Sequence, residues 1–292
     1  MTGSAPPILS AVELYKHFGG LVAVDHVSLE VRAGEVVGLL GDNGAGKSTL
    51  IKMIAGVYEP DGARLLLNGR DASFSSPQEA RDAGIETIYQ DLALCENLDA
   101  GANIFLGREP VRPMLVVLRA VDRQRMLVES RRILDQLDIR IPGLARPIRQ
   151  MSGGQRQAVA IARAVYWNAQ LMIMDEPTAA LGVPEQRKVL ALVRTLRERG
   201  VGVIIISHNL QDVLDVADRV VVMRRGRAVG ERQVADTNTS ELLALMIGAL
   251  IIAVIQNGLV ILAINPFWQF VTVGIVIILA VLVDQAKARV VR

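Results

Sequence analysis

Cysteine is almost absent from this chain, because its 292 residues contain a single one, Cys95. That excludes an internal disulfide framework and suits a reducing compartment, with Cys95 acting as a small apolar side chain. An excess of one charge sign is absent too, since 32 basic residues stand against 30 acidic ones, and nothing therefore points to nucleic acid as a partner. The first residues lack the basic and apolar segments of a signal peptide, so we expect a cytosolic N-terminal part.

Charged residues are missing from one long stretch near the C-terminus. From Leu242 to Val283, 42 consecutive residues include no Asp, Glu, Lys or Arg. Asn265 and Pro266 interrupt this stretch and leave an uncharged run on either side. A helix needs about 17 to 25 residues to cross a bilayer core, and each run is long enough.

Three basic residues, Lys287, Arg289 and Arg292, follow the second run. Basic residues flanking a span favour the cytoplasmic side of a membrane. The pattern predicts two transmembrane helices with a basic cytoplasmic tail over residues 248–292. The alternative is an apolar hairpin that docks within a soluble protein.

A glycine-rich segment follows the apolar run Val36–Leu40 and matches the pattern GxxxxGK[ST]. It consists of Gly41, Asp42, Asn43, Gly44, Ala45, Gly46, Lys47, Ser48 and Thr49. A buried strand, a glycine-rich loop and a helix start together predict a cradle for nucleotide phosphates, in which backbone N–H groups surround the β-phosphate. We expect Lys47 to lie over the β- and γ-phosphates and the Ser48 hydroxyl to bind Mg²⁺.

Polar residues also stand where later apolar runs end. Leu171–Met174 leads into Asp175 and Glu176, and Gly202–Ile206 leads into His208. At the carboxyl edge of a parallel sheet, Asp175 would face Mg²⁺ and Glu176 a water that attacks the γ-phosphate. His208 would contact the γ-phosphate.

Gln90 follows the strand predicted at Ile85–Tyr89, where its amide could reach a metal or the attacking water, or simply face solvent. Phe18 is either an adenine-stacking ring or a core residue.

The remaining pattern predicts further strands and helices. Two strands are expected within residues 8–31, bridged by Tyr15 to Gly20, and a third runs over Arg64–Leu67 into an Asn-Gly turn. Ser76 opens a short helix that Gly84 closes. Residues 92–150 have a helical character, with a helix at Arg123–Leu137. Ser152 caps a helix at Arg156–Trp167, and a hairpin ends the domain at 219–230.

These motifs, taken in chain order, resemble the nucleotide-binding domain of ATP-binding cassette (ABC) transporters over residues 8 to about 247. They are Phe18, GDNGAGKST, Gln90, MSGGQ, LMIMDEP and His208. Within that family, GDNGAGKSTLIKMIAG, SPQEARDAGIETIYQDLAL, NIFLGRE and MDEPTAALGV are similar to bacterial sugar importers of the ribose, xylose and fructose type with a single cassette.

The family resemblance implies an α/β P-loop fold over residues 1–247. Its parts would be a mixed sheet core, an antiparallel β subdomain and a helical subdomain at about 92–165. ATP would be bound by the phosphate loop and Phe18, with Mg²⁺ held by Ser48, Gln90 and Asp175. Glu176 would be the catalytic base and His208 the γ-phosphate switch, with Gln90 facing the permease.

A signature segment, Ser152, Gly153, Gly154 and Gln155, would complete the ATP site of the opposite subunit. The implied assembly is therefore a cassette homodimer on a sugar permease in the bacterial inner membrane, cassette on the cytoplasmic side, served by a periplasmic sugar-binding protein. Which sugar is carried would depend on the permease and the binding protein. The alternative is an uncoupled or soluble ATPase that serves as a regulatory module.

The chain departs from the family pattern at two positions. Met151 stands where the family pattern has Leu, and Gly182 stands where many cassettes have Asp, which leaves coupling between subunits through that position open. GALIIAVIQNGL and FWQFVTVGIVIILAVLVDQAKAR resemble the C-terminal end of a permease of the same importers. The chain thus resembles an ATPase joined near Gly248 to a piece of its own partner.

Overall fold

The computed structural model describes residues 6–113, 119–141, 143–179, 181–237, 239 and 241–242. The chain divides into two compact units, Met1–Thr237 and Asn238–Arg292. Nearly all of the second unit lies outside the described residues, and both predicted transmembrane helices fall there. Within the described part of the chain, every helix is too short or too polar to cross a membrane.

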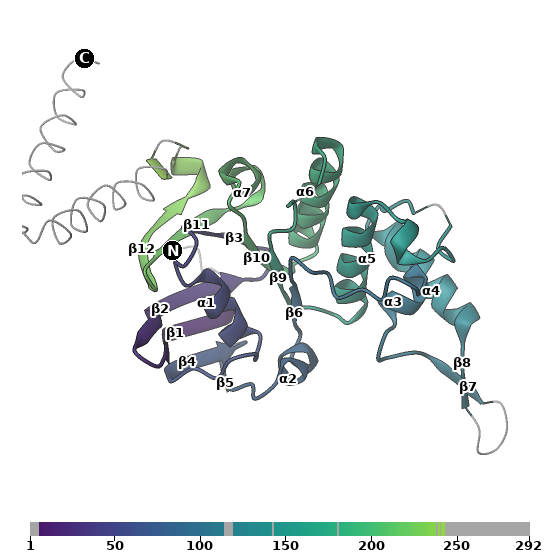
Figure 1. Cartoon of the computed structure of the whole chain (residues 1–292), viewed down its shortest axis with the longest axis horizontal. Helices are drawn as coiled ribbons and strands as arrows, with labels where there is room; N and C mark the ends of the chain where they lie inside the picture. Colours follow the sequence, from purple (N-terminus) through teal and green to yellow (C-terminus); the bar gives the residue numbers. More distant parts are fainter. Residues whose placement is uncertain are drawn as a thin grey trace, which may run out of the picture. The chain divides into compact units, whose positions relative to one another are not determined.

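A six-stranded sheet, ordered β12-β11-β3-β10-β9-β6, forms the centre of the first unit (Figure 1). The strands are β3 (Val36–Leu40), β6 (Ile85–Ile88), β9 (Leu171–Asp175), β10 (Gly202–Ile206), β11 (Arg219–Arg224) and β12 (Arg227–Gln233). All pairs are parallel except β11 with β12. Every residue of β3 and β10 is buried, as expected for strands covered on both faces. Because β3, β6, β9, β10 and β11 run parallel, their carboxyl ends meet at one edge of this sheet.

A second, antiparallel sheet has the order β2-β1-β4-β5. Its strands are β1 (Pro7–Phe18), β2 (Leu21–Arg32), β4 (Gly62–Leu67) and β5 (Arg70–Ala72). The predicted connection at Tyr15 to Gly20 is wrong in extent, because β1 pairs with β2 as far as Phe18 and only Gly19 and Gly20 turn.

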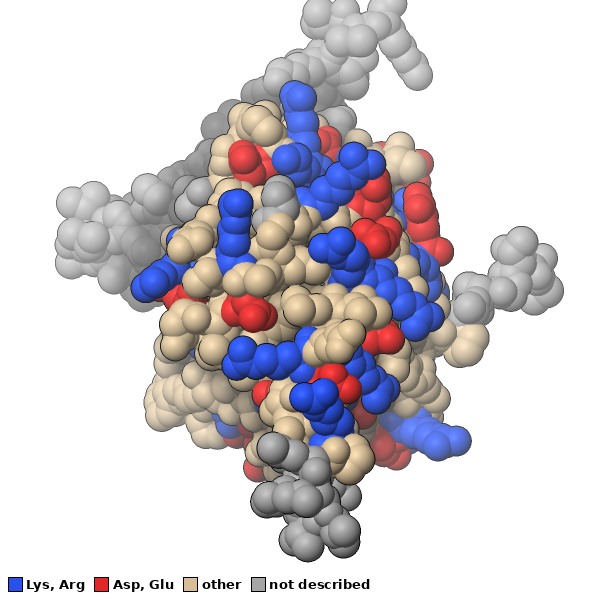
Figure 2. All heavy atoms as spheres, turned by 90° about the vertical axis from the view of Figure 1, so that its right-hand side faces the viewer, with Lys and Arg blue, Asp and Glu red and all other residues tan. Residues whose placement is uncertain are grey.

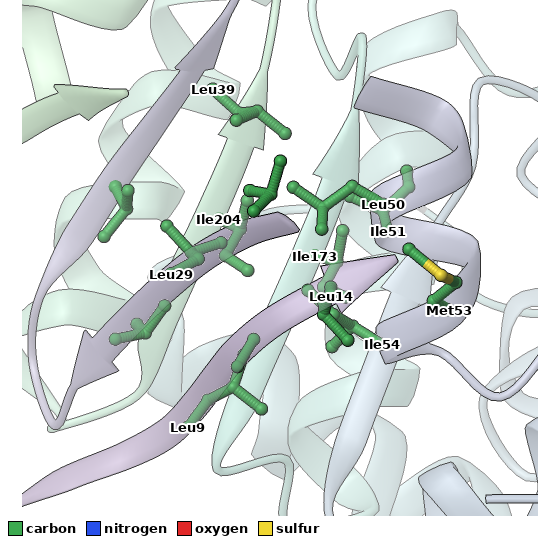
Figure 3. Packing of buried hydrophobic residues seen from close by; sticks show 14 of the residues in the cluster. Leu9, Leu14, Leu29, Leu39, Leu50, Ile51, Met53, Ile54, Ile173 and Ile204 are labelled. Carbon is green, nitrogen blue, oxygen red and sulfur yellow. The ribbon is translucent and has the colours of Figure 1, made fainter. Parts of the chain in front are cut away.

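The main core lies between the two sheets and helix α1 (Lys47–Ile54). Leu9, Leu14 and Leu29 come from the antiparallel sheet (Figure 3). They pack with Leu50 and Ile54 of α1 and with apolar residues of the central strands, all fully or nearly fully buried. This apolar packing fixes α1, and so the phosphate loop, against the central sheet.

Two further helices follow Glu176 and His208, which lie just beyond β9 and β10. They are α6 (Val183–Glu198) and α7 (Leu210–Val216), which contact β10 and β3 respectively. At Gly38 of β3, an added Cβ would come within 2.3 Å of Val213 on α7. Glycine is needed in the middle of this strand because the helix packs so closely against it.

The helical part of the unit contains α3 (Ala100–Ile104), α4 (Arg123–Gln136) and α5 (Gly153–Tyr166), which contact one another. On α4, Met126, Ile133 and Leu134 are buried and its arginines are exposed. Figure 2, which faces this end, shows Lys and Arg side chains interspersed with Asp and Glu. The helices thus bury an apolar stripe and present a charged outer surface.

Two predictions for this region need correction. A hairpin of β7 (Val111–Pro113) and β8 (Arg119–Val121) interrupts the stretch expected to be helical, because Pro110 and Pro113 prevent helix continuation. Helix α5 begins at Gly153 and not at Arg156, because Ser152 is its N-cap and accepts the Gln155 N–H at 3.3 Å.

The short helices complete the fold. Helix α2 (Pro77–Asp82) is capped by Ser76, as predicted, while the Glu79 carboxylate accepts the N–H of Ser75. Single 3₁₀ turns lie at Ile148–Gln150 and Val234–Asp236.

Glu86 is a buried acid on β6 for which no role was predicted. It is 5% exposed, and burial raises its pKa to about 7 although Arg163 favours its charged form. Since the pKa of Glu86 in the folded state exceeds the usual glutamate value of about 4.5, the unfolded chain ionises first as pH rises, and the folded state loses stability between about pH 4.5 and 7.

We expect Glu86→Gln to raise the free energy of unfolding at pH 8 by about 3 kcal/mol, with a much smaller gain at pH 5. Melting temperatures of the parent and the variant across this range measure the difference. Glu198→Gln, at an exposed position of α6, is the control and should leave the free energy of unfolding unchanged at both pH 5 and pH 8. Equal gains at pH 5 and pH 8 would contradict the assignment.

Candidate functional site

The phosphate loop runs from the end of β3 into α1. Gly41, Gly44 and Gly46 have φ values of +147°, +80° and +100°. An added Cβ would lie 2.3 Å from the Met223 carbonyl oxygen at Gly41 and 2.5 Å from the Ala23 carbonyl oxygen at Gly46. Neither backbone oxygen can move aside easily, so this loop conformation requires glycine at both positions.

The start of α1 lies inside this loop and has no side-chain cap. Its first backbone N–H groups therefore point into the loop with the positive end of the helix dipole. Lys47 Nζ donates to the carbonyl oxygens of Gly41 at 2.6 Å and Asp42 at 2.9 Å. Burial lowers the pKa of Lys47, while Glu176 and Asp175 counteract it. The loop thus offers N–H groups and one ammonium group, which fits a chain of phosphates.

Glu176 and His208 meet at the carboxyl edge of the sheet. The His208 N–H donates to Glu176 Oε1 at 3.1 Å, and His208 Nδ1 lies 2.8 Å from Oε2. The His208 side chain is exposed, whereas that of Glu176 is largely covered. Glu176 has a φ of +53°, an unusual value for a residue with a side chain. Such strain costs of order 1–3 kcal/mol and is common where a side chain must be aimed at a reacting group.

Asp175 is the last residue of β9 and lies near the phosphate loop, since its charge acts on Lys47. Burial raises the pKa of Asp175, the Glu176 carboxylate raises it further, and Lys47 and Lys52 lower it. Its half-buried carboxylate beside the loop offers oxygen atoms of the kind that bind Mg²⁺. Ser48, which is exposed in the first turn of α1, offers a hydroxyl on the loop itself.

Gln90 and the signature segment lie at the other end of this edge. Gln90 is exposed just beyond β6 and lines a cavity of about 250 Å³ with Glu176 and Gly153. Ser152, Gly154 and Gln155 line a separate cavity of about 530 Å³ together with Glu185 and Lys188 of α6. Ser152 is exposed, with Gln155 completing a capping box.

Phe18 ends β1 and is 43% exposed. Its ring meets the edge of Tyr58 at 5.3 Å between centroids, and Lys16 Nζ lies 5.7 Å from its centre. The structure thus brings together the loop, Asp175, Glu176 and His208, and it leaves Phe18 as an exposed ring beside Tyr58.

The turn between β11 and β12 also belongs to the site, which was not predicted. The Gly226 N–H donates to the Ala45 carbonyl oxygen at 2.9 Å, and the Gly226 carbonyl accepts from the Asp25 N–H at 2.8 Å. Gly226 therefore connects the phosphate loop, at Ala45, to strand β2, at Asp25, through its backbone hydrogen bonds. The Arg-Gly turn was visible in the sequence, but its contact with residue 45 depends on β11 pairing with β3.

A parallel sheet with a GxxxxGKST loop, two carboxylates and a histidine along its carboxyl edge defines a P-loop protein that binds nucleoside triphosphates. Residues 24–179 match the family model described as "ABC transporter". The chain belongs to the ABC transporter family, and as a member with this fold it is an ATP-binding cassette that hydrolyses ATP.

Similar proteins are ATP-binding subunits of importers. The chain is 48% identical to the xylose/arabinose import ATP-binding protein XylG of Sulfolobus acidocaldarius, over 82% of this chain and 93% of that protein. It is 44% identical to the fructose import ATP-binding protein FrcA of Rhizobium meliloti, over 83% and 95%. A ribose import ATP-binding protein, RbsA 1 of Rubrobacter xylanophilus, is 46% identical over 83% of this chain and 47% of its own length.

Solved structures agree on the fold. A nucleotide-free ATP-binding cassette from an ABC transporter superposes with a TM-score of 0.68 at 27% identity, covering 82% of this chain and 95% of that one. A dimeric cassette bound to ADP and phosphate superposes with a TM-score of 0.65 over 77% and 98%, and at 23% identity this likeness concerns the fold alone.

Proposed function

We propose that this chain is the ATP-hydrolysing subunit that energises sugar import through an ABC transporter. The observation that carries the proposal is the convergence of the phosphate loop, Asp175, Glu176 and His208 at one sheet edge. Relatives named for the import of xylose and arabinose, fructose and ribose support a sugar as the transported solute.

In this proposal Glu176 is the base that takes a proton from the water attacking the γ-phosphate. Its Oε1 accepts the His208 N–H, and its Oε2 is buried 2.8 Å from His208 Nδ1 with no hydrogen-bond partner among the described residues, so we propose that movement of the exposed His208 side chain admits the water. His208 is proposed to contact the γ-phosphate, and Lys47 and the loop N–H groups to bind the phosphates. The exposed ring of Phe18 is proposed to stack on adenine.

Mg²⁺ fits the oxygen donors at this edge. We propose that Ser48, Asp175 and Gln90 hold it, directly or through water. When bound, the ion neutralises charge on the phosphate oxygens. Gln90 is also proposed to respond to the permease, since it lies beyond the sheet edge and beside the helical region.

The proposed active unit is a homodimer of cassettes on a permease. The exposed Ser152 and the N-terminus of α5 behind it are suited to bind phosphate of a nucleotide held by the opposite subunit. A sugar-binding protein outside the cell would deliver the solute to the permease. The proposed location is the cytoplasmic side of the cell membrane.

The proposed domain boundary lies near residue 247. Residues 1–247 would be the cassette, with the helical subdomain at about 92–165, and 248–292 two transmembrane helices with a basic tail, similar to the end of a permease. The uncharged run from Leu242 to Val283, most of which lies within residues 248–292, supports this proposal.

ATP hydrolysis by the purified full chain tests the function, with Lys47→Ala as the diagnostic variant. Loss of the ammonium group should weaken ATP binding at least tenfold, because a charge-assisted contact to phosphate is worth about 1.5–3 kcal/mol. Arg125→Ala, at an exposed position of α4, is the control and should bind ATP like the parent. Equal ATP affinity in the Lys47 variant would refute the phosphate site.

A second experiment tests the coupling to transport. The chain, purified with its neighbours from membranes of its own host, should carry a permease whose sugar-loaded binding protein stimulates ATP hydrolysis. A preparation in which hydrolysis stays unchanged by any pentose or hexose would argue against sugar import.

A further inference from the structure

A buried hydrogen bond connects the segment that follows Glu176 to the helix that follows His208. Thr178 Oγ1 donates to Asp212 Oδ2 at 2.6 Å. Thr178 is 4% exposed and Asp212 is 6% exposed. A carboxylate is costly to bury, and one that is kept beside a hydroxyl donor holds that donor firmly.

The two segments joined by this bond also meet at the reaction edge. Glu176 precedes Thr178 by two residues, and His208 precedes Asp212 by four. The first junction, between His208 and Glu176, lies at the surface, where a nucleotide can change it. The second junction lies in the interior, out of reach of any nucleotide, and so sets the distance between the two segments.

The segment after Glu176 is held on its other side by the signature segment. The Ala179 N–H donates to the Glu176 carbonyl at 3.1 Å, and the Leu181 N–H donates to the Thr178 carbonyl at 3.3 Å. An added Cβ on Gly153 would lie 2.6 Å from Leu181 Cδ2, so Leu181 packs directly against the start of α5. A shift of Thr178 would therefore move both Glu176 and the contact of Leu181 with Gly153.

We propose that Asp212 is a positioning residue for ATP hydrolysis, acting through Thr178. It holds the turn that aims Glu176 and keeps Leu181 against Gly153. This inference rests on the proposed role of Glu176.

Asp212→Asn is the first test, because it keeps the shape of the side chain and removes its charge. We expect kcat to fall about tenfold with an unchanged KM for ATP, since small misplacement of a reacting group can cost up to about 10²-fold. Thr178→Ser keeps the hydroxyl and should hydrolyse ATP near the parent rate. Asp215→Asn makes the same change at an exposed position of α7 and is the matched control.

A double variant separates positioning from stability. Thr178→Val with Asp212→Leu removes both polar groups, so neither is left buried without a partner. Its melting temperature should recover relative to Thr178→Val alone, while kcat stays low. Recovery of kcat together with the melting temperature would show that the pair acts through stability only and would overturn the proposal.

Amide hydrogen exchange gives a readout that does not depend on hydrolysis. In the full chain, Asp212→Asn should speed exchange at the Ala179 and Leu181 N–H groups, whereas Asp215→Asn should not. A parent chain without ATPase activity would refute the proposed function, and faster exchange would still support positioning by Asp212. Unchanged exchange, or an unchanged kcat in an active chain, would overturn the inference.

Discussion

Glu176→Gln should lower kcat for ATP hydrolysis by about 10² to 10⁴-fold, the range attributed to a general base, while ATP still binds. The amide keeps an oxygen that can accept the His208 N–H, now 3.1 Å from Oε1, so the edge of the sheet should keep its shape. It can no longer take a proton from water. Steady-state hydrolysis together with nucleotide affinity measures both halves of the expectation.

Glu198→Gln again serves as the control, because this carboxylate is exposed at the end of α6. A Glu176 variant that hydrolyses ATP at the parent rate would show that another group activates the water. His208, which approaches the same carboxylate, would then be the next residue to replace.

Asn103→Ala should lower the free energy of unfolding by about 4 kcal/mol, because it removes several buried hydrogen bonds at once. Asn103 is 0% exposed. Its Oδ1 accepts the Cys95 N–H at 2.7 Å, and its Nδ2 donates to the carbonyls of Cys95 at 3.1 Å and Asp99 at 2.9 Å. These bonds fold the segment between Gln90 and α3, so the loss should also disturb that segment.

Urea unfolding of the full chain in a mild detergent, followed by tryptophan fluorescence, measures this effect. Asn97→Ala is the matched control, since Asn97 is an exposed residue of the same loop. Equal midpoints for the two variants would mean that backbone contacts alone hold the loop.

The contact between Thr178 and Asp212 and the burial of Asn103 could not be predicted from the sequence. Asp212 lies 34 residues from Thr178, so the sequence gives no signal of their contact. Asn103, in the short helix α3, resembles any polar residue of a helix until its burial is known. The β7 and β8 hairpin was missed because short strands in a region with helical spacing leave a weak pattern.

Local chemistry in the sequence determined the phosphate loop, the order of the strands along the chain and the polar residues at the strand ends. Glycine spacing and runs of apolar residues are sufficient for this, since both act within a few residues. Only the tertiary structure decided that Gly226 supports residue 45, that His208 meets Glu176, and that Glu86 is buried with a raised pKa. These relations depend on which strands become neighbours, and strand pairing is set by long-range packing of the whole core.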